Sequence, residues 1–293
     1  ILRKGKEMKT IDTLIEDIHK TLEEGINTSS VQNRDAIHSF ANDLAYSITR
    51  QLGEGKRGKQ SSLRMSQIGK PDRQLWYEIT SDIEPEPIDG QTKMKFIMGD
   101  ILEALLILLT KLSGHEITEE QKEVELDGIK GHKDCRIDGT LVDIKTASSY
   151  AFKKFKDGTL HSDDPFGYIA QISGYAEADK DTEAAFFAID KSSSEMTVMK
   201  VEPIHMINAT QRIGKVKNFI ASSTPPPRCY PDEADGKSGN RKLAIGCIYC
   251  PFKDDCWKDA NGGMGLRKFK YSNGIRYLTQ VGKVPDVPEV TNA

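Results

Sequence analysis

The sequence predicts an α/β or α+β fold in which helices flank a mixed central sheet. Segments with helical spacing alternate with β-rich segments in the order helix, strands, helix, strands, helix. The dipeptide Asp138-Gly139 between two of the β-rich segments is a strong signal for a two-residue hairpin turn. The 293 residues are 37% hydrophobic and 29% charged, which is ordinary for a globular protein with a sizeable core.

Apolar residues spaced three or four apart predict helices over Thr10–Gly25 and Ile37–Ile48. A Gly- and Lys-rich loop follows from Gly53 to Lys59. Lys93–Leu112 is a strongly apolar helix that we expect to be buried on most faces. Its longest apolar run, Ala104–Leu109, is far too short to span a bilayer.

The second half of the chain supplies the predicted sheet and two further helices. Asp164-Pro165 offers a helix N-cap and a first helical residue for a helix that ends at Asp179. A second helix covers Ile204–Ser222 and is broken by Thr224–Pro227. The predicted strands are Glu116–Asp127, the two arms of the hairpin, Ala184–Asp190 and Met196–Glu202.

Three regions follow from this order of elements. We expect residues 1–90 to form an N-terminal helical region with a basic segment, and the Pro-rich stretch Glu84–Gly90 to be its linker. Residues 91–223 form the α/β core. Residues 224–293 contain four of the five cysteines and form a C-terminal cysteine-cluster segment.

The predicted hairpin brings two carboxylates together. With Asp138-Gly139 as the loop, Ile137 pairs with Thr140 and Asp134 falls opposite Asp143. Like charges directly opposite each other destabilise a sheet, so the pair is either solvated or bridged by a cation. The other face of the hairpin suits a core, because side chains alternate along a strand and this face carries Cys135, Ile137, Val142 and Ile144.

Carboxylate and carbonyl oxygens are the ligands that Mg²⁺ and Mn²⁺ prefer. Asp134 and Asp143, with the carbonyl of Ile144, therefore form a candidate metal site. Lys145 shares the face of Asp143 and could orient or deprotonate a metal-bound water, or neutralise charge on a phosphate. The alternative is a solvated polar face on which Lys145 pairs with a carboxylate.

Three polar residues on the flanking helices favour the metal site. Glu103 lies inside the apolar helix, where a carboxylate is costly unless it is paired or binds metal. Gln171 and Tyr175 are four residues apart and share one helix face. Gln can donate and accept hydrogen bonds, and Tyr can stack on a base or bind a phosphate. The alternatives are a solvent-facing stripe for Glu103 and a surface coincidence for the other two.

These motifs together resemble the PD-(D/E)XK nuclease superfamily. Asp134 and Asp143-Ile144-Lys145 match its central motif, with Asp143 where many members have Glu. Gly99-x-x-x-Glu103 and Gln171-x-x-x-Tyr175 are similar to the flanking motifs of the RecB-like and phage exonuclease branch. The resemblance covers about Ser66 to Trp257. It implies a restriction-endonuclease-like α-β-β-β-α-β core and metal-dependent phosphodiester hydrolysis, in which Glu103, Asp134 and Asp143 hold metal, Lys145 acts on water, and Gln171 and Tyr175 position DNA.

The C-terminal cysteines have the spacing of metal ligands. Cys247-x-x-Cys250-x5-Cys256, with Cys229 as a fourth thiolate, suits tetrahedral Zn²⁺ or an iron–sulfur cluster. RecB-like nucleases end in a similar motif that holds a [4Fe-4S] cluster, and this resemblance favours the cluster over zinc. Their fourth cysteine lies upstream, where this chain has Pro71-Asp72, so Cys229 would have to replace it.

A basic run near two aromatic residues suits single-stranded nucleic acid, because cations bind the backbone and rings stack on bases. The run continues from Lys56–Lys59, and its candidate DNA-binding residues are Arg64, Lys70, Arg73, Trp76 and Tyr77. The net charge of the chain is only −3, so no global charge imbalance announces a nucleic-acid or membrane partner.

The leading hypothesis is a Mg²⁺- or Mn²⁺-dependent DNA exonuclease that acts on single strands or free ends, in a phage-type recombination, repair or degradation role. The phage-type role rests on the resemblance alone. The competing hypotheses are an endonuclease of the same superfamily and a non-catalytic nucleic-acid-binding protein with structural zinc. No leader opens the sequence, so we expect a cytoplasmic protein. The sequence leaves the oligomeric state open.

Overall fold

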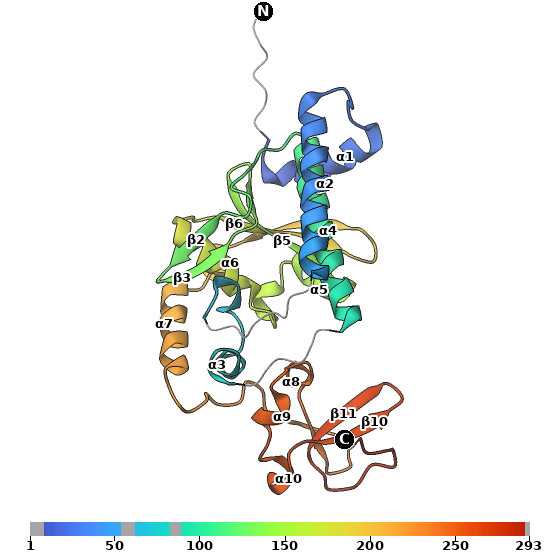
Figure 1. Ribbon diagram of the computed structural model, residues 1–293, viewed down its shortest axis with the longest axis vertical. Helices are drawn as coiled ribbons and strands as arrows, with labels where there is room; N and C mark the ends of the chain where they lie inside the picture. Colours follow the sequence, from blue (N-terminus) through green and yellow to red (C-terminus); the bar gives the residue numbers. More distant parts are fainter. Residues whose placement is uncertain (1–8, 54–61, 83–88, 291–293) are drawn as a thin grey trace, which may run out of the picture. The chain divides into compact units, whose positions relative to one another are not determined.

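A computed structural model describes residues 9–53, 62–82 and 89–290 (Figure 1). Most of the predicted Gly53–Lys59 loop and of the Glu84–Gly90 linker lies outside the described residues. The chain divides into two compact units. The first holds the described parts of residues 1–58, 63–69 and 87–214, and the second holds those of residues 59–62, 70–86 and 215–293. The division into three regions remains a prediction.

The first unit contains most of the predicted helices and strands. Its helices, besides short 3-10 turns, are α1 (Leu14–Glu24), α2 (Val31–Leu52), α4 (Gly90–Leu112), α5 (Ser149–Lys156), α6 (Tyr168–Asp179) and the first half of α7 (Ala209–Ile220). Its strands are β1 (Ile117–Thr118), β2 (Glu123–Leu126), β3 (Ile129–His132), β4 (Cys135–Ile137), β5 (Thr140–Ala147), β6 (Ala184–Asp190) and β7 (Met196–Val201).

A five-stranded mixed sheet forms the centre of the first unit, as the sequence predicts. Its strand order is β1-β4-β5-β6-β7, and only the β5–β6 pair is parallel. The strands β2 and β3 form a separate two-stranded ribbon. Every residue of β6 is buried, which is typical of a strand covered on both faces.

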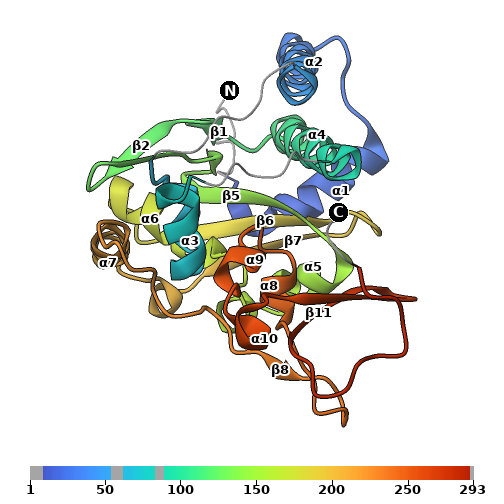
Figure 2. The same ribbon diagram turned by 60° about the horizontal axis from the view of Figure 1, so that its bottom comes forward.

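Helices cover both faces of this sheet, and each face has its own apolar core (Figures 1 and 2). Successive side chains of a strand point to opposite faces, so Phe186 and Phe187 of β6 enter different cores. The helices α1 and α4 pack on the face of Phe187. The helices α5, α6 and α7 pack on the face of Phe186. The mixed sheet flanked by helices is consistent with the restriction-endonuclease-like core that was predicted.

The hairpin turn is confirmed. Asp138 and Gly139 have φ angles of 48° and 85°, and Ile137 pairs with Thr140. The ladder ends at Cys135, however, so Asp134 lies just before β4 and is not paired with Asp143 as a strand residue. The predicted apolar face is confirmed, because its four residues all belong to the core under α1 and α4.

The apolar helix α4 differs from its prediction in burial. It was expected to be buried on most faces, but only Leu106, Leu108 and Thr110 are fully buried. Met94 and Met98 are exposed. The buried residues lie in the second half of α4, because that half packs on the sheet while the first half extends past it.

The starts of two helices were predicted wrongly, and one predicted strand is divided into two. Helix α6 begins at Tyr168 and not at Pro165, although the Asp164 carboxylate still accepts hydrogen bonds from the first two amides of the helix. Helix α7 begins at Ala209, where Asn208 caps it by accepting from the amide of Gln211. The expected strand Glu116–Asp127 is split into β1 and β2, because residues between them adopt positive φ angles.

The second unit is built around a small sheet and four short helices. The sheet has the order β10-β11-β9-β8. Tyr77 stacks on Phe252 with ring centroids 5.5 Å apart. The elements of this unit are α3 (Asp72–Thr80), β8 (Glu233–Ala234), β9 (Arg241–Lys242), α8 (Ile245–Ile248), α9 (Lys253–Cys256), α10 (Ala260–Gly263), β10 (Arg267–Tyr271) and β11 (Gly274–Gln280).

None of the described helices combines the length and the apolar character that crossing a membrane requires.

Candidate active site

Six predicted site residues from four parts of the first unit come together. Strand β5 supplies Asp143 and Lys145, the residue before β4 supplies Asp134, and helix α4 supplies Glu103. Helix α6 supplies the remaining two, Gln171 and Tyr175. Hydrogen bonds, an ion pair and charge interactions link all six.

Asp143 is the buried centre of this site, with a side chain that is 1% exposed. Its Oδ1 accepts a hydrogen bond of 3.3 Å from Gln171 Nε2. Its Oδ2 forms a close, charge-assisted ion pair with Lys145 Nζ. Both oxygens of this buried carboxylate are therefore engaged, one by the Gln171 amide and the other by the Lys145 ammonium.

Asp134 reaches the site through its side chain. Because the ladder stops at Cys135, the amide of Ile144 is free to donate to Asp134 Oδ2, at 2.7 Å. Burial and the neighbouring carboxylates of Asp143 and Glu103 raise the pKa of Asp134 well above its usual range. The Ile144 side chain is 5% exposed and packs in the core, so only its backbone is available to the site.

Glu103 is half-buried and accepts a hydrogen bond of 3.2 Å from Gln121 Nε2. Burial, together with the carboxylates of Asp143 and Asp100 and against the opposing charge of Lys145, raises the pKa of Glu103 to about 7. The hydrogen bond from Gln121 and the nearby charges of Asp143 and Lys145 are consistent with the prediction that Glu103 belongs to the site and not to a solvent-facing stripe.

The site holds more negative than positive charge. Burial also raises the pKa of Asp143, against the effect of Lys145. Burial alone would lower the pKa of Lys145, but Asp143 and Asp134 outweigh it and raise that pKa, so the ammonium stays protonated. Lys145, with a smaller contribution from Arg50, therefore faces three carboxylates whose ionisation is resisted, and a bound divalent cation would relieve this repulsion.

The donor set suits a hard cation that keeps part of its water shell. Within the described part of the chain, no three His, Cys, Asp or Glu side chains come close enough together to hold a metal ion unaided. Mg²⁺ is usually bound by one or two carboxylates together with waters and substrate phosphates. Asp134 and Asp143 fit that open mode of binding better than a closed cage.

Gln171 and Tyr175 act from the opposite helix. Gln171 Nε2 also lies 3.4 Å from the Tyr175 hydroxyl, to which it donates. Tyr175 is only 1% exposed, and burial raises its pKa to about 12. Its ring therefore offers no stacking surface for a base, and its contribution is to hold Gln171 against Asp143.

Two residues at the site were missed by the sequence reasoning. Tyr168 places its ring 4.9 Å from Lys145 Nζ, and Gln121 donates to Glu103. Tyr168 precedes Gln171 by three residues on α6, so helical spacing could have indicated it. Nothing in the sequence around Gln121 indicated its role, because it lies in an irregular segment with a φ of 51°.

A pH dependence follows from the pKa of Glu103. The folded-state value of about 7 exceeds the ordinary 4.5, so ionising Glu103 destabilises the metal-free protein as the pH rises between those values. Divalent metal needs the ionised form, so we expect metal affinity to increase as the pH passes through about 7. Calorimetric titration with Mn²⁺ from pH 5.5 to 8.5 measures this. Glu103→Gln should bind more weakly and lose the rise near neutral pH, and an unchanged pH profile in that variant would contradict the assignment.

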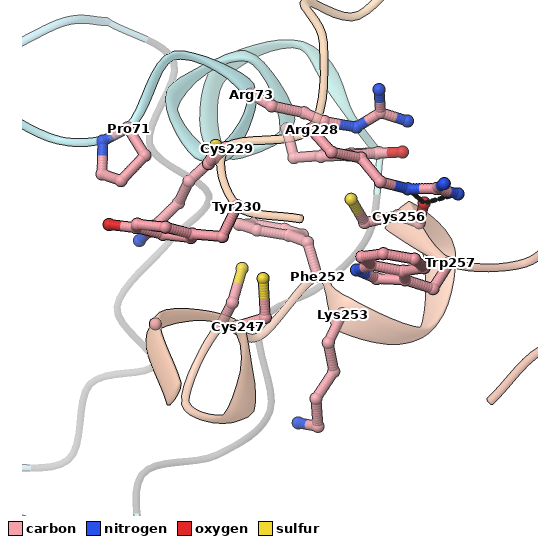
Figure 3. A pocket seen from close by; sticks show the side chains of 14 residues that line it. Pro71, Arg73, Arg228, Cys229, Tyr230, Cys247, Phe252, Lys253, Cys256 and Trp257 are labelled. Atoms are coloured by element: carbon pink, nitrogen blue, oxygen red, sulfur yellow. Dashed lines mark hydrogen bonds between the residues drawn. The ribbon is translucent and has the colours of Figure 1, made fainter. Parts of the chain in front are cut away.

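The second unit brings the four C-terminal cysteines around one pocket. Cys229, Cys247, Cys250 and Cys256 all line it, and it has an empty volume of about 390 Å³ including its open mouth. Figure 3 shows the sulfurs of Cys229, Cys247 and Cys256 on three sides of this space. The sulfurs surround the pocket and do not meet at one point, in agreement with the lack of a set for one metal ion among the described side chains.

Two buried N–H groups border the same pocket. Arg73 Nε and Trp257 Nε1 are both buried and without a hydrogen-bond partner, and both residues line the pocket. Arg73 and Arg228 counteract the effect of burial on the pKa of Cys256. Unsatisfied donors and cations around four thiols fit an anionic, sulfur-ligated group.

The predicted basic residues make local contacts. Lys70 pairs with Glu78 at 2.9 Å, and Arg73 Nη1 donates to the carbonyl of Pro226 at 2.8 Å. Both contacts lie within the second unit. Arg64 belongs to the first unit, where its amide donates to Gln67.

The two predicted aromatic residues are also engaged within the second unit. Trp76 Nε1 donates to the carbonyl of Ser222 at 2.9 Å. Tyr77 is 9% exposed and stacks on Phe252. Their role in binding DNA stays a prediction.

Comparison with known proteins gives weak structural similarities. A structure described as SSO0001 is 15% identical and has a TM-score of 0.38, over 72% of this chain and 93% of that chain. An alkaline exonuclease from Laribacter hongkongensis is 13% identical with a TM-score of 0.31, over 56% of this chain and 86% of that chain. The structure of that exonuclease in complex with dAMP is 15% identical with a TM-score of 0.32, over 53% of this chain and 92% of that chain. No protein-family model matches the chain. No curated protein matches it. These similarities are too weak to assign the chain to a family.

Proposed function

We propose that this protein is a Mg²⁺- or Mn²⁺-dependent deoxyribonuclease that hydrolyses phosphodiester bonds, acting as an exonuclease on strands with free ends. One observation carries the proposal. The three carboxylates Glu103, Asp134 and Asp143 gather around a single lysine in a buried site, with a raised pKa at each carboxylate. Among the described residues, Lys145 and to a smaller extent Arg50 oppose this negative charge, and a phosphate-bound divalent cation would compensate it further.

The carboxylates and the lysine would have different roles at the phosphate. Asp134 and Asp143 would hold the metal, with Glu103 as a further carboxylate, and the metal would supply a Lewis acid and a more acidic water. Lys145 stays protonated, so it contributes positive charge where negative charge develops on the phosphate. The structure favours this role over the deprotonation of water by Lys145.

The decisive experiment is a digestion assay on three DNA substrates. Linear single strands and duplexes, labelled at the 5′ or the 3′ end, and closed circular DNA are incubated with Mg²⁺, Mn²⁺ or EDTA. We expect metal-dependent release of nucleotides from linear DNA and no cutting of the circle. Asp134→Asn, prepared in the same way, controls for contaminating nucleases.

Each other outcome has a definite meaning. Cutting of the closed circle by wild type, and not by Asp134→Asn, would make the protein an endonuclease. Absence of cleavage with every metal, in protein shown to be folded, would contradict the nuclease proposal and leave the non-catalytic nucleic-acid-binding protein. The phage-type role in DNA processing is part of the same proposal. It depends on the expected result, which is metal-dependent release of nucleotides from linear DNA.

We also propose that the four cysteines hold a [4Fe-4S] cluster in preference to zinc. Four thiolates support either, but the spread of the sulfurs around an open pocket and the two unsatisfied N–H donors suit a cluster with its own sulfides. Such a cluster would have a structural role, because it would cross-link the segment around Cys229 to the helices α8 and α9.

A preparation purified without air tests the cluster. We expect iron, acid-labile sulfide and a brown colour in wild type, and their loss in Cys250→Ser with a fall in the melting temperature of the second unit. Cys135→Ala is the matched control, because Cys135 is buried in the core of the first unit. A colourless protein that contains zinc and no iron would overturn the cluster and establish the zinc alternative.

A further inference from the structure

Two exposed aromatic side chains lie just beyond the catalytic strand. Helix α5 begins at Ser149, four residues after Lys145, and its second residue is Tyr150. Tyr150 is 75% exposed, and Phe166, in the loop that leads to α6, is 62% exposed. Large aromatic side chains at the surface that serve neither core indicate a contact surface.

A chain of ring contacts joins Phe166 to the active site. Phe166 stacks on Tyr168 with ring centroids 5.5 Å apart and an interplanar angle of 26°. The Lys145 ammonium lies 4.9 Å from the centroid of the same Tyr168 ring. Phe166 is therefore separated from the lysine of the active site by a single ring.

The loop that carries Phe166 is fixed at both ends. Gly167 has a φ of 75°, and a Cβ there would lie 2.4 Å from the backbone of Gly69, so only glycine permits this close approach. Lys154 Nζ donates to the carbonyl of Asp163 at 3.0 Å and pairs with the carboxylate of that residue. A surface that is fixed before binding loses less conformational entropy when it binds.

Positive charge accompanies the two rings. Lys154 also lies 5.1 Å from the centroid of the Tyr150 ring, and Lys153 next to it is exposed. Alternating rings and ammonium groups are the features that bind single strands, because rings stack on bases and cations contact phosphates. By contrast, Tyr77 of the predicted basic segment is buried and already stacked.

We propose that Tyr150, Lys153 and Phe166 form a platform for an unpaired DNA strand, on which a base next to the scissile phosphate stacks on Phe166. The ligand class is single-stranded DNA, and the position beside Lys145 rests on the proposed nuclease function. The platform would favour substrates whose end is unpaired or frayed, because a base must leave the duplex before it can stack on a protein ring.

Binding measured without cleavage tests this proposal. Fluorescence anisotropy of a labelled single-stranded oligonucleotide is recorded in EDTA, with a duplex of equal length as competitor. We expect Phe166→Ala and Tyr150→Ala each to weaken binding about tenfold, the usual scale for losing one stacked base. Tyr46→Ala is the matched control, because Tyr46 is 69% exposed on α2 and has no place in the platform.

Two further variants separate stacking from a general loss of structure. Phe166→Trp should retain affinity, and its added indole fluorescence should be quenched by the single strand and less by the duplex. Lys153→Ala should reduce the slope of log affinity against log salt by roughly 0.7, the value for one contact to a single strand. Affinity equal to wild type in Phe166→Ala, or an equal loss in Tyr46→Ala, would overturn the proposal.

The two proposals fail in different ways. Because the binding assay contains EDTA, it reports on the platform independently of cleavage. A protein that binds through Phe166 in EDTA but cleaves nothing when Mg²⁺ or Mn²⁺ is supplied supports the platform and refutes the nuclease. A protein that cleaves with metal while Phe166→Ala binds like wild type refutes the platform alone.

Discussion

Asp134→Asn is expected to lower metal-dependent cleavage by at least about 10³-fold, because a metal that polarises phosphate and water supplies several kcal/mol of transition-state stabilisation. The variant should nevertheless fold. The Asn side-chain oxygen can still accept from the Ile144 amide, a contact of 2.7 Å in wild type. Rates on labelled linear DNA, measured with saturating Mn²⁺, give the size of the effect.

The same variant should be more stable than wild type when metal is absent. Burial, with the charges of Asp143 and Glu103, raises the pKa of Asp134, so its ionised form destabilises the folded protein above the ordinary pKa of 3.8. A neutral Asn removes this penalty. Melting temperatures in EDTA at pH 8 should therefore be higher for Asp134→Asn. Added Mn²⁺ should raise the melting temperature of wild type more than that of the variant.

Asp190→Asn is the matched control for these measurements. Asp190 is also buried, but the Ser192 amide donates to it and lowers its pKa, so its ionised form stabilises the fold. Amidation there should lower the melting temperature and leave Mn²⁺ stabilisation in place. If Asp134→Asn also destabilised the metal-free protein and kept its activity, Asp134 would be a structural residue.

The central part of the fold was predictable because its signals are local. Asp138-Gly139 sets both the turn and the register, and alternation then assigns Cys135 and Ile137 to the core. Two residues of the candidate site were predictable for the same reason, since Asp143 and Lys145 share one strand face.

The errors arise where tertiary contacts override local signals. Asp164 has the sequence of an N-cap, but the close approach of Gly167 to Gly69 delays the start of α6 to Tyr168. Asp134 was expected opposite Asp143, but the ladder ends one residue earlier and its side chain binds an amide.

The sequence also could not show which aromatic side chains near the candidate site are exposed and which are buried. Phe166 stands between two helices in a Pro- and Asp-containing loop, and no spacing rule distinguishes an exposed ring from a buried one there. Tyr175 illustrates the reverse case, because its helical position suggested contact with DNA while its ring is buried.

Lys145→Ala is also expected to lower the rate of metal-dependent cleavage, by about 10³-fold. Its effect on the stability of the metal-free protein should be opposite to that of Asp134→Asn. Removing the ammonium leaves Asp143 Oδ2 buried without its ion-pair partner. Breaking a buried pair from one side typically costs about 3–5 kcal/mol. The melting temperature in EDTA should therefore fall in Lys145→Ala, whereas it should rise in Asp134→Asn.

Lys145→Arg separates the two roles that the sequence allows for this lysine. Asp143 and Asp134 outweigh the effect of burial and keep the pKa of Lys145 high, so the group acts as a fixed positive charge. Arginine preserves that charge and should recover part of the activity, about tenfold over Lys145→Ala, since the charge is kept but the geometry is changed. A general base would behave differently, because arginine cannot deprotonate. Equal inactivity of the two variants, with wild-type rates that keep rising at alkaline pH, would identify Lys145 as the base.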